Sequence, residues 1–217
     1  MRLTTVTRME LPDGVVHRYV TKISPAQGGD LPPSFDQARH ASLGPRAGSW
    51  MAVAFALPFV ADRDVVARAW LRVIARHGTL RTVLVGGAGR GPAVGDGVSA
   101  GVDDDHDDEL RLRPVTVQPL GWRIPPSMPG EDPREVIRRV LDEACCPFAR
   151  PAHALCLVQP RDPQQRPVVV IGFDHSHVDA WSLLVVMRDF CAELSFCAAL
   201  AEGVGNVGSG LVGAGIG

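Results

Sequence analysis

Hydrophobic and polar positions alternate along the chain with two periods, and each period predicts a different kind of element. Apolar residues recur at helical spacing in three segments, from Asp62 to Gly78, from Asp132 to Pro147 and from Trp181 to about Ala199. Continuous or alternating apolar runs predict strands at residues 50–59, 79–85, 111–117, 154–158 and 167–173. Because strands alternate with helices, the pattern predicts an α/β fold.

The same pattern predicts three regions. Residues 1–30 form a lead-in hairpin around the turn signal Pro12-Asp13-Gly14, and residues 31–197 form the folded unit. Residues 198–217 are rich in glycine, have no periodicity and are expected to be a disordered tail. A long loop rich in Gly and Asp is expected at 86–109. Within the folded unit, the run VVVIGF at 168–173 is apolar on both faces, which is typical of a central strand.

Composition and charge exclude some classes of partner. The chain has 217 residues, 46% of them hydrophobic, and a formal net charge of -2, so it lacks the overall positive charge of a nucleic-acid-binding protein. No apolar run approaches the roughly 20 residues of a membrane-spanning helix. The N-terminal residues lack the pattern of a secretion signal, and five cysteines without regular spacing favour a reducing, cytoplasmic location.

Polar residues follow directly after the predicted central strand. His175, His177 and Asp179 lie in the segment DHSHVDA at 174–180, where rigid backbone would hold accessible side chains. Residues two apart share a face in extended backbone, whereas a turn at Ser176 would separate them.

Two kinds of chemistry fit this segment. The pattern H-x-H-x-D offers two imidazoles and a carboxylate to zinc. However, no histidine follows Asp179, and the histidines at 17, 40, 77, 106 and 153 show no ligand spacing, so no metal site is expected. The pattern H-x-x-x-D instead makes His175 a general base, because an imidazole that titrates near neutrality can accept a proton from a hydroxyl or an amine.

Four blocks in order carry a resemblance to a known superfamily. FDHSHVDAWSLL at 173–184 resembles the HHxxxDG signature of condensation domains and chloramphenicol-acetyltransferase-like acyltransferases. The other blocks resemble the family's N-terminal S-x-x-Q block, its RHxxLRT block and its Pro-Phe segment; they are PPSFDQARH (32–40), ARHGTLRT (75–82) and CPFARPAHALCLV (146–158). The form D-H-x-H-x-D is most similar to polyketide-associated acyltransferases of actinobacteria, which esterify sugars or alcohols in envelope lipid assembly.

The resemblance implies a fold and a reaction. The fold would be a chloramphenicol-acetyltransferase-like lobe, the N-terminal one of two, with a mixed sheet flanked by helices. The reaction would move an acyl group from a coenzyme A or carrier-protein thioester to a hydroxyl or amine, in lipid or nonribosomal-peptide biosynthesis. It requires no metal and no tightly bound cofactor. The expected partners are these substrates and a carrier protein, a second lobe or a second copy of the chain.

The resemblance also assigns roles to single residues. His175 matches the catalytic histidine, and Asp179 matches an aspartate that pairs with an arginine to hold the loop. The first candidate for that arginine is Arg76 and the alternative is Arg81. His177 would support the site structurally, as would Asp174, which stands where the signature has its first histidine.

The sequence also departs from the family pattern. Ala180 replaces the usual glycine, and nothing in the chain resembles the family's second lobe. An alternative hypothesis is therefore an inactive half-domain that acts only by associating with another lobe or chain.

Overall fold

The computed structural model describes residues 5–87 and 109–208, with side chains placed as far as Ala201. Six strands form a sheet in the order β2-β6-β5-β1-β4-β3, and every strand pairing in it is antiparallel. In chain order the elements are η1 (Val6–Arg8), β1 (Gly14–Pro25), α1 (Phe35–Ala41), β2 (Trp50–Ala56), α2 (Arg63–Arg76), η2 (Gly78–Arg81), β3 (Thr82–Val85), β4 (Arg111–Arg123), α3 (Pro133–Ala144), β5 (His153–Pro160), β6 (Val168–Asp174) and α4 (Ala180–Gly208).

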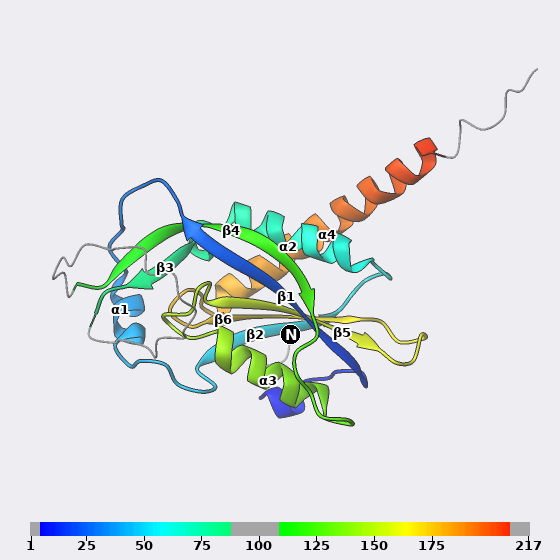
Figure 1. Cartoon of the computed structure of the whole chain (residues 1–217), viewed down its shortest axis with the longest axis horizontal. Helices are drawn as coiled ribbons and strands as arrows, with labels where there is room; N and C mark the ends of the chain where they lie inside the picture. The colour runs from blue at the N-terminus through cyan, green and yellow to red at the C-terminus, as the bar shows by residue number, and fades with distance from the viewer. Residues whose placement is uncertain (1–4, 88–108, 209–217) are drawn as a thin grey trace, which may run out of the picture.

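The sheet is covered on both faces, which explains why β6 is apolar throughout. Val169, Ile171 and Phe173 point into the core shared with α2 and α4, whereas Val168 and Val170 point into the core under α3. This is the period-two alternation of a strand whose two faces are both buried. Figure 1 shows α2 and α4 on one side of the sheet and α3 on the other. The prediction of a central strand is confirmed.

Gly172 lets α3 approach β6 closely. A Cβ atom at this position would lie 2.4 Å from Leu141 Cδ2 and 3.3 Å from Cys145 Sγ. Leu141 is fully buried on the inner face of α3, so it has no free space into which to move. The single glycine of β6 therefore sets the distance between this helix and the strand that leads to His175.

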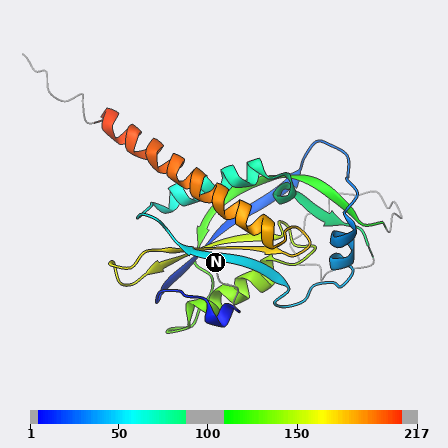
Figure 2. The same ribbon diagram turned by 180° about the vertical axis from the view of Figure 1, so that it is seen from behind.

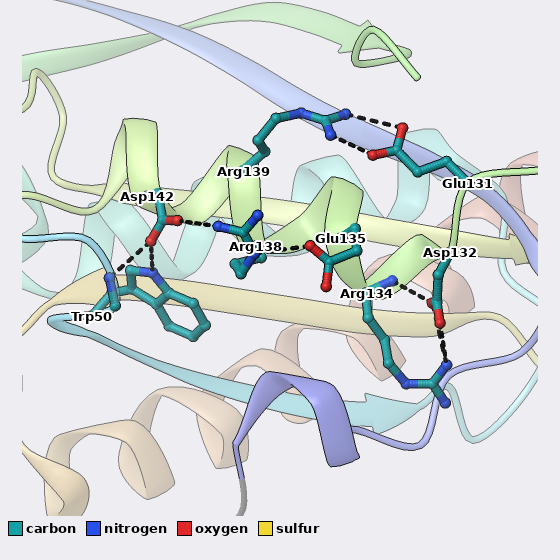
Figure 3. Close-up of polar contacts among 9 residues, drawn as sticks. Trp50, Glu131, Asp132, Arg134, Glu135, Arg138, Arg139 and Asp142 are labelled. Atoms are coloured by element: carbon teal, nitrogen blue, oxygen red, sulfur yellow. Dashed lines mark hydrogen bonds and ion pairs between the residues drawn. The ribbon is translucent and has the colours of Figure 1, made fainter. Parts of the chain in front are cut away.

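Polar contacts along α3 fix the start of β2 (Figure 3). Asp142 Oδ1 accepts hydrogen bonds from the Trp50 indole at 2.7 Å and from the Gly48 backbone at 2.9 Å. Arg138 lies between Glu135 and Asp142 on the helix and contacts Asp142 at 3.1 Å, one turn later, and Glu135 at 3.0 Å, one turn earlier. Because β2 is the neighbour of β6, this network helps to position the strand next to the candidate site.

Two predictions about the fold are wrong. The lead-in hairpin does not form, because β1 is one long strand that pairs with β5 on one side and with β4 on the other. Gly14 starts this strand where its backbone approaches Gln159 so closely that a Cβ atom would lie 2.1 Å from the carbonyl oxygen. Residues before 30 are thus part of the sheet. The sheet is also antiparallel rather than mixed, because each described strand runs opposite to its neighbours.

The last helix is longer than its sequence pattern indicated. α4 continues past Ala199 to Gly208, so part of the tail expected to be disordered is helical. A helix already formed on the protein gains one hydrogen bond for each residue added, which offsets the cost of single glycines. Figures 1 and 2 show that α4 begins at the end of the molecule that carries α1 and projects away from it. Most of the predicted loop at 86–109 and residues 209–217 lie outside the described residues.

Within the described ranges, none of the helices has the length and hydropathy that a membrane span requires.

Candidate active site

A tight turn separates the two histidines that follow β6. The backbone N–H of His177 donates to the carbonyl of Asp174 at 3.1 Å, which closes a turn over residues 174–177. His177 is turned into the protein and is 8% exposed, whereas His175 is exposed. His175 and His177 therefore do not share a face, and of the two only His175 is exposed to solvent.

Asp174, Ser176 and His177 form a buried support beneath this turn. Ser176 donates to Asp174 Oδ1 through its backbone N–H at 2.8 Å and also through its hydroxyl. The same hydroxyl lies 3.0 Å from Nδ1 of His177. All three side chains are buried, so these contacts hold the turn without competition from water. The structural roles expected of Asp174 and His177 remain predictions, and this arrangement places both side chains beneath the turn.

His175 lines a cavity of about 580 Å³ that lies between the β6–α4 turn and α1. Ser34, Gln37, Arg39 and His40 line the α1 side. The rings of His40 and His175 lie side by side in the cavity wall, with 5.0 Å between their centroids and 33° between their planes. The cavity thus places the predicted base beside a second imidazole.

The S-x-x-Q block is the capping box of α1. The side chain of Ser34 accepts from the backbone N–H of Gln37 at 3.2 Å, and the side chain of Gln37 accepts from the backbone N–H of Ser34 at 2.9 Å. These reciprocal bonds satisfy two backbone donors that the first turn would otherwise leave unpaired. Ala41 at the far end is buried against Leu84 and Leu112. Both ends of this short helix are therefore fixed.

Asp179 caps α4, and within residues 5–87 and 109–208 no arginine side chain is paired with it. Its Oδ1 accepts from the hydroxyl of Ser182 at 2.6 Å and from the Ser182 backbone N–H at 2.7 Å. These hydrogen bonds lower the pKa of Asp179. Since a carboxylate at a helix start satisfies exposed N–H groups, the bonding of Asp179 follows from its place at the first turn of α4.

The two candidate arginines lie elsewhere. Arg76 is 3.7 Å from Asp189 and 3.7 Å from Glu193, both on α4, and it therefore connects α2 with α4. Asp189 is buried and also contacts His77 Nε2 at 3.0 Å. Arg81 is exposed, and no ion pair of its side chain is found in residues 5–87 and 109–208. The expected pairing of Asp179 with Arg76 or Arg81 is thus corrected, because Ser182 occupies the carboxylate instead.

Loss of the Asp179 cap should loosen the start of α4. We expect Asp179→Ala to lower the midpoint of thermal unfolding by roughly 2–4 °C, because the first turn loses its side-chain acceptor. Asp179→Ser keeps an acceptor at this position and should retain most of the wild-type midpoint. Circular dichroism during heating measures both variants. Equal midpoints for the alanine and serine variants would contradict a capping role.

His153 is a buried histidine next to the site. Its Nε2 donates to the carbonyl of Leu80 at 3.2 Å, and its ring packs edge-on against Trp70. Burial lowers the pKa of His153 to about 4. The ring is therefore neutral in the folded protein at neutral pH.

This histidine should make stability depend on pH. The unfolded chain, in which His153 has a pKa near 6.5, binds the proton more readily than the folded chain does. The contribution of His153 to the free energy of unfolding should therefore be complete above about pH 6.5. It should fall between about pH 6.5 and 4, by at most about 1.4 kcal/mol per pH unit. Urea unfolding at several pH values measures this slope. His153→Gln keeps a donor for Leu80 without titrating, and parallel pH curves for variant and wild type would show that His153 is not responsible.

The residues that suggested metal binding are not arranged as ligands. His177 is buried inside the turn, and Asp179 is bonded to Ser182. In residues 5–87 and 109–208, no group of three or more His, Cys, Asp or Glu side chains is placed to hold a metal ion.

Comparison with solved structures gives a consistent answer about the fold. The "PapA2 acyl transferase" matches 88% of this chain with a TM-score of 0.58 and 14% identity, over 40% of its own length. The starter condensation domain of rhizomide synthetase matches 81% with a TM-score of 0.53 and 18% identity, over 39% of its length. The epimerization domain of tyrocidine synthetase B matches 82% with a TM-score of 0.52 and 14% identity, over 37% of its length.

The chain has the fold of the condensation-domain superfamily. The α/β class and the chloramphenicol-acetyltransferase-like lobe implied by the sequence resemblance are thus confirmed. The chain spans about two fifths of the length of the structures it resembles. No family model and no curated protein matches the sequence.

Two residues with contacts at or near the candidate site were not predicted from the sequence. His40 lies inside the block PPSFDQARH, but its contact with His175 depends on how α1 packs. Asp189 lies in the middle of α4, where its contacts with His77 and Arg76 join two helices. The sequence did contain a signal for His40, because a histidine stands one turn after Gln37 in a block that resembles the family.

Proposed function

We propose that this protein is an acyltransferase that moves an acyl group from a thioester to a hydroxyl or an amine. The observation that carries the proposal is the position of His175. It is exposed, it follows a fully buried strand, and it opens into a cavity large enough for a thioester and part of an acceptor. The fold, shared with an acyl transferase and with condensation domains, supports the same chemistry.

In the proposed reaction, His175 acts as the general base. Its neutral ring accepts the proton of the acceptor O–H or N–H while the oxygen or nitrogen attacks the carbonyl carbon of the thioester. The tetrahedral intermediate then collapses, the C–S bond breaks, and the departing thiolate takes the proton from the imidazolium. The products are an ester or amide and a free thiol. Atoms, charge and protons balance without a metal or a resident cofactor.

Asp174, Ser176, His177 and Asp179 would have structural roles in this mechanism. The first three hold the turn from below, and Asp179 fixes the first turn of α4. Together they restrict the backbone on both sides of His175, which keeps the base oriented toward the cavity.

We place the protein in the cytoplasm, where its five cysteines would remain unpaired. The acyl donor would be coenzyme A or a phosphopantetheinyl carrier protein, and the pathway would be lipid or nonribosomal-peptide assembly. A second lobe or a second copy of the chain would complete the other side of the cavity.

Thiol release tests the proposed reaction directly. The purified chain is mixed with acetyl-, octanoyl- or palmitoyl-coenzyme A, or with an acylated carrier protein, and with alcohols, sugars and amines. We expect thiol release that depends on the acceptor, an acylated product detected by mass spectrometry, and no effect of a metal chelator. Absence of acceptor-dependent release with every donor would overturn the proposal, and loss of activity with the chelator would favour the metal-site hypothesis.

A further inference from the structure

His40 is a second imidazole that faces the reacting side of the cavity. It comes from α1, far from His175 in sequence, yet the two rings lie 5.0 Å apart between centroids. Both line the same cavity. A substrate bound in this cavity can therefore contact both imidazoles at once.

The fold holds His40 in place from both ends of its helix. The capping box of Ser34 and Gln37 fixes the first turn, and buried Ala41 anchors the residue that follows His40. The carbonyl of His40 accepts from the backbone N–H of Ser42 and, at 3.2 Å, from that of Leu43. These contacts fix the backbone of α1 around His40, so the fold places this residue beside the cavity before a substrate binds.

The surroundings of His40 favour the neutral form of its ring. Partial burial lowers the pKa of His40; Asp174 acts in the opposite direction, and the positive charge of Arg46 contributes to the lowering. A neutral imidazole has one N–H donor and one acceptor nitrogen. In the described part of the chain, no side-chain hydrogen bond of His40 is found, so its donor is available to a bound molecule.

We propose that His40 is a catalytic residue that donates a hydrogen bond to the thioester carbonyl oxygen. This inference rests on the proposed function and adds a second group to it. As the acceptor attacks and His175 takes its proton, the carbonyl oxygen gains negative charge, and the N–H of His40 stabilises that charge. When the C–S bond breaks, the oxygen returns to a carbonyl and His40 keeps its proton. A neutral imidazole can serve as such a donor in an active site.

A pair of octanoyl-coenzyme A analogues tests the contact without turnover. In the ketone analogue, CH2 replaces the sulfur and the carbonyl remains, whereas the alkyl thioether has the sulfur but no carbonyl. We expect His40→Phe to weaken binding of the ketone by about 5- to 10-fold, as for one lost hydrogen bond, and to change binding of the thioether less than about 2-fold. His40→Gln keeps an N–H donor and should bind the ketone within about 3-fold of wild type.

The same variants separate hydrogen bonding from packing in turnover assays. His40→Phe should lower kcat/KM for octanoyl transfer by about 10²- to 10³-fold, with much of the loss in kcat, and His40→Gln should recover at least about 10-fold of it. If the ring served only to pack against His175, phenylalanine would be the better substitute and glutamine the worse. That reversed order would overturn the inference.

The outcomes distinguish this inference from the proposed function. Wild-type turnover that is lost in His175→Ala but unaffected by His40→Phe would leave the acyltransferase and remove the role of His40. A ketone-specific loss of binding in His40→Phe without any wild-type turnover would establish the carbonyl contact and reject the reaction. Failure of the wild type to bind the ketone would overturn the inference about His40, whereas the proposed function is rejected only when no donor gives acceptor-dependent thiol release. Circular dichroism of each variant confirms that it is folded.

Discussion

Replacement of His175 by alanine is expected to lower kcat/KM for acyl transfer by about 10²- to 10⁴-fold, the range for loss of a positioned general base. The structure gives two reasons for an effect of this size. His175 is the exposed histidine of the β6–α4 turn, and the other histidine of that turn is buried and already in contact with Ser176. No side chain of the turn can therefore replace the missing base. Steady-state thiol release, measured across several pH values, gives the ratio.

The matched control for this variant is His17→Ala. His17 lies on β1 and contacts Arg63 at 3.0 Å, and it does not line the cavity. This variant should keep wild-type kcat/KM. Binding of the octanoyl-coenzyme A thioether should be nearly unchanged in His175→Ala, because the proposed role of His175 is in the chemical step. Equal activity of His175→Ala and wild type would reject the general-base assignment.

Replacement of Trp70 by alanine is expected to give the largest loss of stability, about 3–5 kcal/mol in the free energy of unfolding. Trp70 is 1% exposed and packs edge-on against His153 at 5.3 Å and Phe173 at 6.0 Å between centroids. A domain is stable by only about 5–15 kcal/mol, so this cavity would remove a large fraction of the total. Urea unfolding followed by circular dichroism measures the loss.

A second tryptophan provides the control for that experiment. Trp181 on the first turn of α4 is 74% exposed, and its replacement by alanine should change stability by no more than about 0.5 kcal/mol. Equal losses for the two variants would mean that the core is not organised around Trp70. Because Phe173 precedes Asp174, we also expect Trp70→Ala to lower acyl transfer in the folded fraction by disturbing the end of β6.

The contacts around β6 explain how the fold supports the candidate site. Phe173 is held by Trp70 on one face, and Gly172 admits Leu141 and α3 on the other. Asp174 and Ser176 then turn the chain within a buried environment, and His175 is left exposed at the top of the turn. Burial on both faces of β6 thus fixes the start of the turn and leaves the His175 imidazole accessible.

Local signals in the sequence were sufficient for most elements and for the position of the candidate base, His175. The sequence offered Asp62 or Asp64 as the cap of α2, and the structure has Asp62; Asp132 caps α3, and Pro133 occupies its first turn, as predicted. The apolar run at 168–173 identified the central strand, and the polar segment after it identified His175. These features depend on residues close together in the chain, so their signals are complete within a short window.

Other features depended on partners that the sequence does not place. The turn signal at Pro12-Asp13-Gly14 suggested a hairpin, but β1 pairs with strands from much later in the chain. Asp179 was expected to meet an arginine, but the nearest available donors are those of Ser182 in its own helix. The glycines after Ala199 suggested an irregular tail, but α4 continues through them to Gly208.

The sequence by itself therefore determined α2, α3, the start of α4, the central strand and the histidine that follows it, because spacing and capping are local properties. It did not indicate the short helix α1. Only the tertiary structure decided that the sheet is antiparallel, that His177 is buried while His175 is exposed, and that His40 lies beside His175. Each of these depends on which distant surfaces bury one another. That choice is made by the packing of the whole core, which no short stretch of residues encodes.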